Sequence, residues 1–239
     1  MPADPVGDQS EPQAPHVTSE PGAPDEPRIG ELSEGEVLRR ILQRLGEASS
    51  ALVGPGDDAA VIAAPDGRVV VTTDTLVHGP DFRLAWSSPF DIGWKAAAVN
   101  LADVAAMGAR PTGLVVALAV PTHLPVSFVE GLADGLRAAC DALSPGCTVV
   151  GGDLTSSDTL TIAVTAFGSL DGVEPVLRSG ARPGDLLAIA GTLGSAARGL
   201  EVLFERGVDA AGQPIPLDTA ALSKADADAL AIQLRPEPP

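Results

Sequence analysis

The chain has 239 residues and a formal net charge of −17 at pH 7, and this acidic balance argues against a nucleic-acid partner, which requires clustered Lys and Arg. Hydrophobic residues make up 45% of the chain and aromatic residues only 3%, with no Tyr, so we expect an aliphatic core and few rings for stacking on bases. No apolar run reaches the ~18 residues that a membrane-spanning helix needs.

Residues 1–27 contain seven prolines and six acidic residues, a composition that predicts a disordered, solvated tail. Order is expected to begin at Ser33, which can form an S-x-x-E capping box with Glu36 ahead of an amphipathic pattern. The pattern predicts a helix that ends near Gly46.

The next segments predict a mixture of strands and helices. Strands are expected at residues 60–63 and 69–73, joined by a turn at 65–67. The clearest helix covers residues 90–107 and closes at Gly108. Further along we expect a strand at 113–120, a helix at 128–143, and strands at 147–150 and 160–167. This alternation favours an α/β or α+β fold over a helical bundle.

Residues 178–185 are rich in turn-forming Gly and Pro and predict a joint between two domains. A strand at 186–190 and a helix at 194–206 would then open a second domain. About 50 residues follow the joint, so we expect this second domain to be incomplete.

The two cysteines, Cys140 and Cys147, have no second Cys pair or nearby His that would complete a zinc pattern. We therefore expect ordinary buried thiols, a usage that suits a reducing cytoplasm.

Two adjacent carboxylates, Asp57 and Asp58, follow Gly54-Pro55-Gly56 at the entry to an apolar segment. Like charges so close repel unless a cation lies near them, and Mg²⁺ prefers oxygen ligands of this kind. The alternative is a loop with two solvated aspartates.

A second polar group, Thr72, Thr73 and Asp74, ends a β-branched run. Strand alternation puts Thr72 and Asp74 on one face and Thr73 on the other. The alternative to a metal site is a polar strand end without further function.

Asp103 lies in a helical stretch that is otherwise almost entirely apolar, and Asn100 shares its face of the helix. An ionised Asp in a buried helix is costly without a partner or a metal. The alternative is an Asp paired with a Lys or with backbone donors.

Gly151, Gly152 and Asp153 follow a further strand. Glycines allow close approach of a ligand to backbone N–H groups, although Gly-Gly also occurs in plain turns. Taken together, Asp58, Asp74, Asp103 and Asp153 indicate a phosphate site with several magnesium ions.

The segments "GPGDDAAVI", "VTTDTLV", "KAAAVNLADVAAMGARP", "GGDLT" and "RSGARPGD" resemble those of thiamine-monophosphate kinases in order and spacing. These enzymes share a superfamily with aminoimidazole ribonucleotide synthetase, selenophosphate synthetase and a hydrogenase-maturation ATPase. The resemblance covers residues 30–239. It implies an α+β, two-domain, aminoimidazole ribonucleotide synthetase-like architecture. In it, residues 28–175 form an N-terminal Mg/ATP-binding dimerisation domain with a mixed sheet and helices, and residues 176–239 begin a C-terminal α+β domain.

The resemblance also implies an activity, the ATP-dependent phosphorylation of thiamine monophosphate to thiamine diphosphate by a homodimer. It assigns Mg²⁺ binding to six positions: Asp58, Thr72, Thr73, Asp74, Asp103 and Asp153. It places Gly151 and Gly152 against the nucleotide phosphates and Arg178 against ATP. No catalytic side-chain base is expected, because the attacking phosphate oxygen is already anionic near neutral pH.

Two departures from the family pattern stand out. Asp81 occupies the position of a family His that contacts substrate, so Asp81 is the candidate substrate-binding residue there. The family's second acidic motif, Asp-x-Ser-Asp-Gly-Leu, does not occur within the chain. The alternatives are therefore another ATP-using enzyme of the superfamily, such as aminoimidazole ribonucleotide synthetase, or a nucleotide-binding fragment without turnover.

Overall fold

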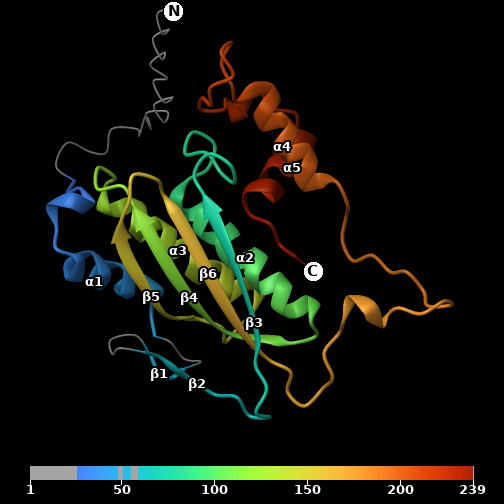
Figure 1. Cartoon of the computed structure of the whole chain (residues 1–239). Helices are drawn as coiled ribbons and strands as arrows, with labels where there is room; N and C mark the ends of the chain where they lie inside the picture. The colour runs from blue at the N-terminus through green and yellow to red at the C-terminus, as the bar shows by residue number, and fades with distance from the viewer. Residues whose placement is uncertain (1–25, 48–50, 55–58, 239) are drawn as a thin grey trace, which may run out of the picture.

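The computed structural model describes residues 26–47, 51–54 and 59–238. Figure 1 shows one β-sheet backed by helices, with a helix pair from the C-terminal part set to one side. In chain order the elements are α1 (Glu34–Leu45), β1 (Ala51–Val53), β2 (Val61–Ile62), β3 (Val70–Val77), α2 (Pro89–Ala106), β4 (Arg110–Val120), α3 (Val126–Leu143), β5 (Val149–Ser156), β6 (Thr161–Ser169), α4 (Ser195–Arg206) and α5 (Lys224–Leu234). Within these described ranges, no helix has both the length and the apolar character needed to cross a bilayer.

The main sheet has four strands in the order β3-β6-β4-β5, so β3 and β5 are its edges. β6 pairs antiparallel with both β3 and β4, whereas β4 and β5 are parallel and are joined by the crossover helix α3. Strands β1 and β2 form a separate antiparallel pair. The predicted turn at residues 65–67 thus joins β2 to β3, but these two strands do not pair with each other: β2 pairs with β1 and β3 pairs with β6.

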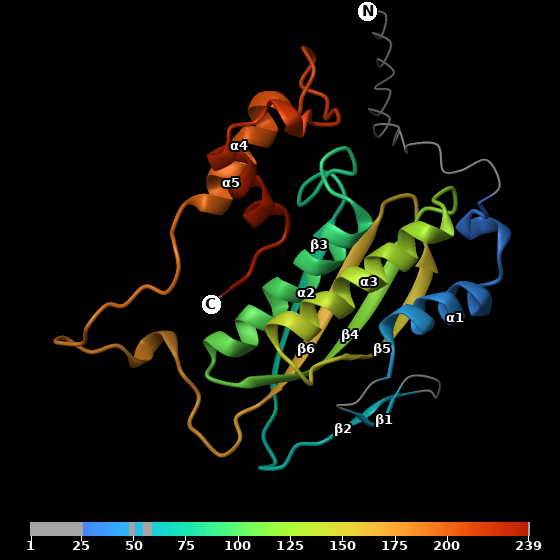
Figure 2. The same cartoon turned by 180° about the vertical axis from the view of Figure 1, so that it is seen from behind.

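Helices α2 and α3 cover one face of the sheet (Figure 2), and no other described element covers the opposite face (Figure 1). Along β4, Leu114, Val116 and Leu118 are buried beneath the helices, whereas Ala117, between them, is exposed on the open face. The largest fully buried side chains are aliphatic and include Ile92, Leu114, Leu124, Leu132, Leu160 and Ile162. The predicted aliphatic core is confirmed.

The helix starts follow the capping signals only in part. Ser33 Oγ accepts a hydrogen bond from the Glu36 N–H at 3.3 Å, but the Glu36 carboxylate pairs with Arg39 at 3.5 Å. The predicted capping box at this helix is therefore half formed. A complete box stands instead at the start of α2, where Ser88 and Asp91 cap each other.

Helices α2 and α3 lie so close that their backbones nearly touch. A Cβ added at Gly93 would lie 2.1 Å from the Leu132 carbonyl oxygen, and one at Gly135 would lie 2.1 Å from that of Phe90. The two glycines thus serve as a reciprocal pair of contact points, one on each helix.

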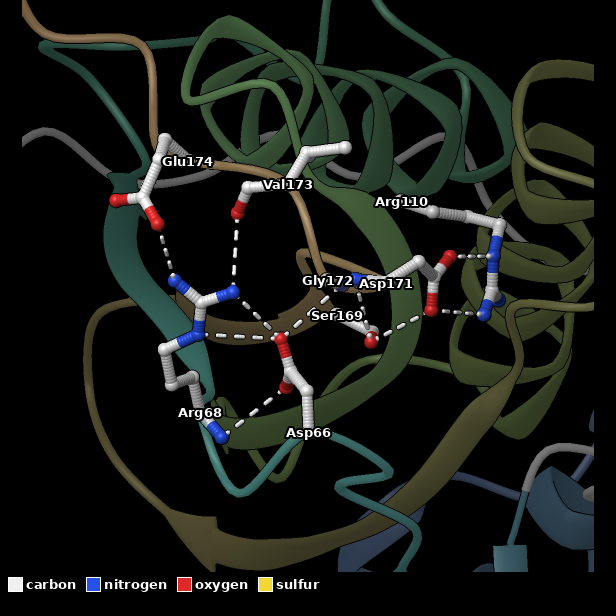
Figure 3. A network of polar contacts seen from close by, with 8 residues as sticks. All are labelled: Asp66, Arg68, Arg110, Ser169, Asp171, Gly172, Val173 and Glu174. Carbon is white, nitrogen blue, oxygen red and sulfur yellow. Dashed lines mark hydrogen bonds and ion pairs between the residues drawn. The ribbon is translucent and has the colours of Figure 1, made fainter.

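A polar network ties the start of β3 and β4 to the end of β6 (Figure 3). Arg68 Nη2 donates to Asp66 Oδ2 at 2.9 Å and to the Val173 carbonyl at 3.1 Å. Arg110 holds Asp171 through two bonds of 3.0 and 3.2 Å. A backbone hydrogen bond from Arg68 lowers the pKa of Asp66, and the Ser169 hydroxyl lowers that of Asp171. The network braces the end of the sheet at which α2 finishes.

Beyond the sheet, residues 186–190 were predicted to form a strand, and this prediction is wrong. No described strand lies beside them to complete a ladder, and their side chains are exposed, with Leu187 fully so. Helix α4, predicted at 194–206, is confirmed at Ser195–Arg206 and packs against α5.

The helix pair α4 and α5 attaches to the sheet layer through two tryptophans. Trp86 Nε1 donates to the Gly207 carbonyl at 2.6 Å, and Trp94 Nε1 donates to the Pro236 carbonyl at 2.8 Å. Arg235 pairs with Asp91 at the start of α2. Burial opposes ionisation of Asp91, but hydrogen bonds from Ser88 and Arg235 outweigh it and hold its pKa below the usual value.

We predict that Gly135→Ala lowers the free energy of unfolding by about 3 kcal/mol, because the new Cβ meets a backbone oxygen that cannot move aside cheaply. Urea unfolding followed by circular dichroism measures the change. The matched control is Gly35→Ala at an exposed position of α1, where a Cβ meets nothing within 4 Å, and it should raise stability by about 0.5 kcal/mol. Wild-type stability of the Gly135 variant would contradict the close packing.

Candidate functional site

The first group of predicted ligands gathers where α2 crosses the edge strand β3. Thr72 Oγ1 donates a hydrogen bond to Asp103 Oδ2 at 3.3 Å. Asp74 lies two residues further along β3, on the same helix-facing side as Thr72, and its side chain is exposed at the sheet edge. The structure thus brings Thr72, Asp74 and Asp103 to one place.

The environment of Asp103 differs from the one expected. Nine residues of α2 are buried, but Asp103 is exposed, so its carboxylate does not need a counter-charge to offset the cost of burial. The reason is its place on the helix flank that overhangs the free edge of β3. Its partner is the Thr72 hydroxyl, a group that also serves as a hard oxygen ligand.

Sequence reasoning placed Asn100 on the face of Asp103 but did not count it as a site residue. Asn100 is 1% exposed, and its Nδ2 donates to the Ala96 carbonyl at 2.9 Å. Its Oδ1 is buried and has no partner among the described residues. A polar residue within an apolar helix was the sequence signal that pointed to it.

Thr73 points away from this group, onto the open face of the sheet. Its hydroxyl donates to the Val164 carbonyl at 3.0 Å and accepts from Thr165 Oγ1 at 3.2 Å. Both bonds are to the neighbouring strand β6, so in this structure Thr73 supports the sheet.

The second group lies on the other edge strand, β5, and comprises Gly151, Gly152 and Asp153. Asp153 stands opposite Ala117 of β4 and is exposed on the open face. A Cβ at Gly152 would lie 2.2 Å from the Val116 carbonyl oxygen, so close strand packing already requires a glycine there. At Gly151 the nearest atom to a Cβ would be Val115 Cγ2, at 3.9 Å. Packing therefore leaves Gly151 free to meet a ligand.

A cavity of about 680 Å³ borders this second group. Its walls come from α1, α3, the residues around β2, and strands β4 and β5, and they are mostly apolar. Gly151, Gly152 and Asp153 form its polar border, and Phe167 is the aromatic ring in its wall. A pocket of this size, apolar with a few convergent polar groups, is typical of a small-molecule site.

The remaining predicted residues are placed as follows. Arg178 is exposed, two residues after Val176, whose N–H donates to the Met107 carbonyl at 2.9 Å. It thus lies near the end of α2 that carries Asp103. Asp81 Oδ2 accepts from the Val77 N–H at 2.8 Å and closes the turn after β3, and its substrate role stays a prediction. Asp58 lies outside the described residues.

The predicted ligands therefore form two half-sites on opposite edges of the sheet. The β3 half-site contains Thr72, Asp74 and Asp103, and the β5 half-site contains Gly151, Gly152 and Asp153. With three strand spacings between the edges, the half-sites are about 14 Å apart. Within the part of the chain that the structure describes, no three His, Cys, Asp or Glu side chains converge as a metal cluster. The described members of the pocket expected from the sequence thus lie in two groups, and the common pocket stays a prediction.

Comparison with known families identifies the sheet-bearing part of the chain. The family model described as AIR synthase related protein, N-terminal domain, matches residues 56–170. Over these residues the chain is similar to that family. The match includes β3 to β6, and hence both half-sites.

Among relatives, the chain is 48% identical over 188 residues to thiamine-monophosphate kinase of Corynebacterium glutamicum, and this alignment covers 77% of this chain and 55% of the relative. It is 45% identical over 177 residues to the thiamine-monophosphate kinase of Mycobacterium tuberculosis, and this alignment covers 74% of this chain and 53% of the relative. A solved structure named "AaThiL complexed with AMPPCP and TMP" is 30% identical, with a TM-score of 0.61, covering 87% of this chain and 60% of that one.

The chain thus spans little more than half the length of the curated relatives it matches. The predicted resemblance to thiamine-monophosphate kinases and the predicted α+β, aminoimidazole ribonucleotide synthetase-like fold are confirmed.

We predict that the two adjacent glycines of β5 differ in their response to alanine. Gly152→Ala should lower the free energy of unfolding by about 2 kcal/mol, because its Cβ meets the Val116 carbonyl oxygen. Gly151→Ala, the matched control, should be within about 0.5 kcal/mol of wild type. Thermal unfolding measures both, and an equal loss in the two variants would contradict the assignment of a packing role to Gly152 alone.

Proposed function

We propose that the protein phosphorylates thiamine monophosphate with ATP, giving thiamine diphosphate, in the cytoplasm. The structural observation that carries the proposal is the cavity that ends at Gly151 and Asp153, beside a strand with an uncrowded glycine. Supporting it are the identities of 45% and 48% to thiamine-monophosphate kinases. The name of the similar structure pairs AMPPCP, an ATP analogue, with TMP, which we take as thiamine monophosphate. Cys140 and Cys147 are free and buried, in keeping with a reducing compartment.

The β5 half-site suits a nucleoside triphosphate. Its apolar cavity would take the base, with Phe167 as the ring against it, and backbone N–H groups at Gly151 would meet phosphate oxygens. Asp153 stands at the border of the cavity, where a cation on the phosphates would lie. Arg178 lies near the end of α2 that carries Asp103, on the side of the β3 half-site, and we keep it as the candidate ATP contact there.

The donor set fits Mg²⁺. Asp74, Asp103 and Asp153 offer carboxylates and Thr72 and Thr73 offer hydroxyls, all hard oxygen ligands. Asn100 Oδ1, a buried acceptor that has no partner among the described residues, lies on the same helix as Asp103. We propose that the three aspartates and the two threonines, together with Asp58, hold several Mg²⁺ ions. These ions would neutralise polyphosphate charge when bound.

The chain's own contribution is positioning. The nucleophile is a phosphate oxygen of the acceptor, which is anionic near neutral pH because its second pKa is about 6. No side chain need remove a proton, so the protein binds two anionic reactants and aligns them for direct transfer. We keep Asp81 as the candidate contact to the acceptor, at the turn that follows β3.

We propose a homodimer, because the half-sites lie on opposite edges of one sheet. In a two-fold dimer, the β3 edge of one subunit can face the β5 edge of its partner. Asp74 and Asp103 would then meet Asp153 of the partner subunit, and the open sheet face would be covered. In this arrangement residues 28–175 form the Mg/ATP-binding dimerisation domain, and residues 176–239 begin a second domain.

The activity is tested by incubating the chain with ATP, Mg²⁺ and thiamine monophosphate and separating the products by chromatography. We expect thiamine diphosphate and ADP in equal amounts, and no product in EDTA. Gly151→Ala should fold normally but bind ATP about tenfold more weakly, because its methyl group displaces phosphate from the backbone N–H groups.

Other outcomes would favour the alternatives. ATP binding without thiamine diphosphate formation would support a nucleotide-binding module without turnover. ATP use that depends on an aminoimidazole ribonucleotide precursor would support the synthetase of the same superfamily.

The dimer predicts complementation between two inactive variants. Asp74→Asn and Asp153→Asn should each abolish activity, because each damages one half of every site. After subunit exchange in a 1:1 mixture, half of the dimers are mixed, and each mixed dimer has one intact site, so about one quarter of wild-type activity should return. A mixture as inactive as its components would show that each site is built within one subunit.

A further inference from the structure

Asn100 is a buried polar residue whose structural role is incomplete. It is 1% exposed, and its Nδ2 donates a hydrogen bond to the Ala96 carbonyl one turn earlier in the same helix. Its Oδ1 has less than 1 Å² exposed and no partner within the described part of the chain. A buried acceptor left without a donor costs about 1–3 kcal/mol, so its retention in an apolar helix calls for an explanation.

The direction of the Asn100 side chain follows from two contacts on α2. Asp103 points to Thr72 of β3, and Val104 points to Gly168 of β6, where an added Cβ would lie 2.3 Å from Val104 Cγ1. At 3.6 residues per turn, Asn100 projects at an angle between these two. It therefore faces the β3–β6 pair.

The height of Asn100 along the strands is also defined. Asn100 lies three residues before Asp103, about 4.5 Å nearer the start of α2. Since α2 descends as β3 rises (Figure 1), this shift corresponds to one to two residues along β3 beyond Thr72. Asn100 is thus directed between Thr72 and Asp74, into the β3 half-site from its buried side.

The chemistry of the two sides of this half-site is complementary. Carboxylates at the rim attract a divalent cation, and Mg²⁺ keeps several of its waters when one or two carboxylates bind it. Each retained water presents O–H donors, whereas a carboxamide oxygen is an acceptor only. An acceptor at the floor of the site would therefore hold a metal-bound water in place.

We propose that Asn100 is a positioning residue of the cation site, whose Oδ1 accepts a hydrogen bond from a water bound to the cation that Asp74 and Asp103 hold. The inference rests on the proposed function, which assigns the cation to this half-site. In the absence of the cation, the orphaned oxygen destabilises α2. When the cation is bound, the same oxygen is satisfied and fixes the cation relative to β3.

The test uses the full 239-residue chain, its Asn100→Leu and Asn100→Asp variants, and Mn²⁺ as the probe ion. Free Mn²⁺ is counted by electron paramagnetic resonance during titration, without nucleotide. Asn100→Leu should bind Mn²⁺ about tenfold more weakly, the usual effect of losing an outer ligand contact. Asn100→Asp, which keeps the acceptor oxygen, should bind at least as tightly as wild type.

Thermal unfolding in EDTA separates this role from a purely structural one. Because Leu removes an unsatisfied buried acceptor at similar volume, Asn100→Leu should be as stable as wild type or more stable in EDTA, and should gain less from added Mg²⁺. A lower melting temperature, or failure to fold, would show that Asn100 serves the apo fold and would overturn the proposal.

A further variant, Asp103→Asn, tests separately whether the β3 half-site binds the cation at all. Weak Mn²⁺ binding by Asp103→Asn together with normal binding by Asn100→Leu would overturn the role of Asn100 and leave the cation assignment intact. Equal Mn²⁺ binding by wild type and Asp103→Asn would overturn the ligand assignment, and the role of Asn100 with it.

Discussion

The arrangement of this protein depends on how closely helix α2 can approach its neighbours. On one side α2 meets α3, where Gly93 and Gly135 let the two backbones come into contact. On the other side Val104 fits against Gly168 of β6. A helix fixed on both sides has little freedom to shift, and the position of its flank over β3 follows. The 3.3 Å bond between Thr72 and Asp103 is thus a consequence of packing by residues that take no part in the site.

Much of this fold follows from local sequence signals. The bounds of the helices α1, α2, α3 and α4 agree with the expected ones within a few residues, and α1, α2 and α4 have a Ser cap or a closing Gly. Strand β3 was expected from its β-branched run, and its alternation correctly put Thr72 and Thr73 on opposite faces. These features depend on neighbours in sequence, which is why they are predictable.

Other features depend on partners distant in sequence and were missed. Residues 186–190 have the composition of a strand, but a strand exists only where another strand completes its hydrogen bonds. The exposure of Asp103 depends on β3 being an edge, a fact of strand order that periodicity does not contain. Likewise, the Val116 carbonyl of the neighbouring strand leaves no room for a side chain at Gly152, whereas packing does not require a glycine at Gly151. The separation of the half-sites on two edges has the same origin.

The attachment of the C-terminal helices has a consequence for spectroscopy. The chain contains two tryptophans and no tyrosine, so its near-ultraviolet emission comes from Trp86 and Trp94. Both indole N–H groups donate to carbonyls of the C-terminal segment, at Gly207 and Pro236, and Trp86 also lies against Phe204. The emission of Trp86 therefore monitors docking of α4 and α5 onto the sheet layer, whereas Trp94 also packs against the hydrophobic core. Replacing Trp94 by Phe would leave Trp86 as the probe for release of the C-terminal helices, and a backbone probe would follow melting of the strands.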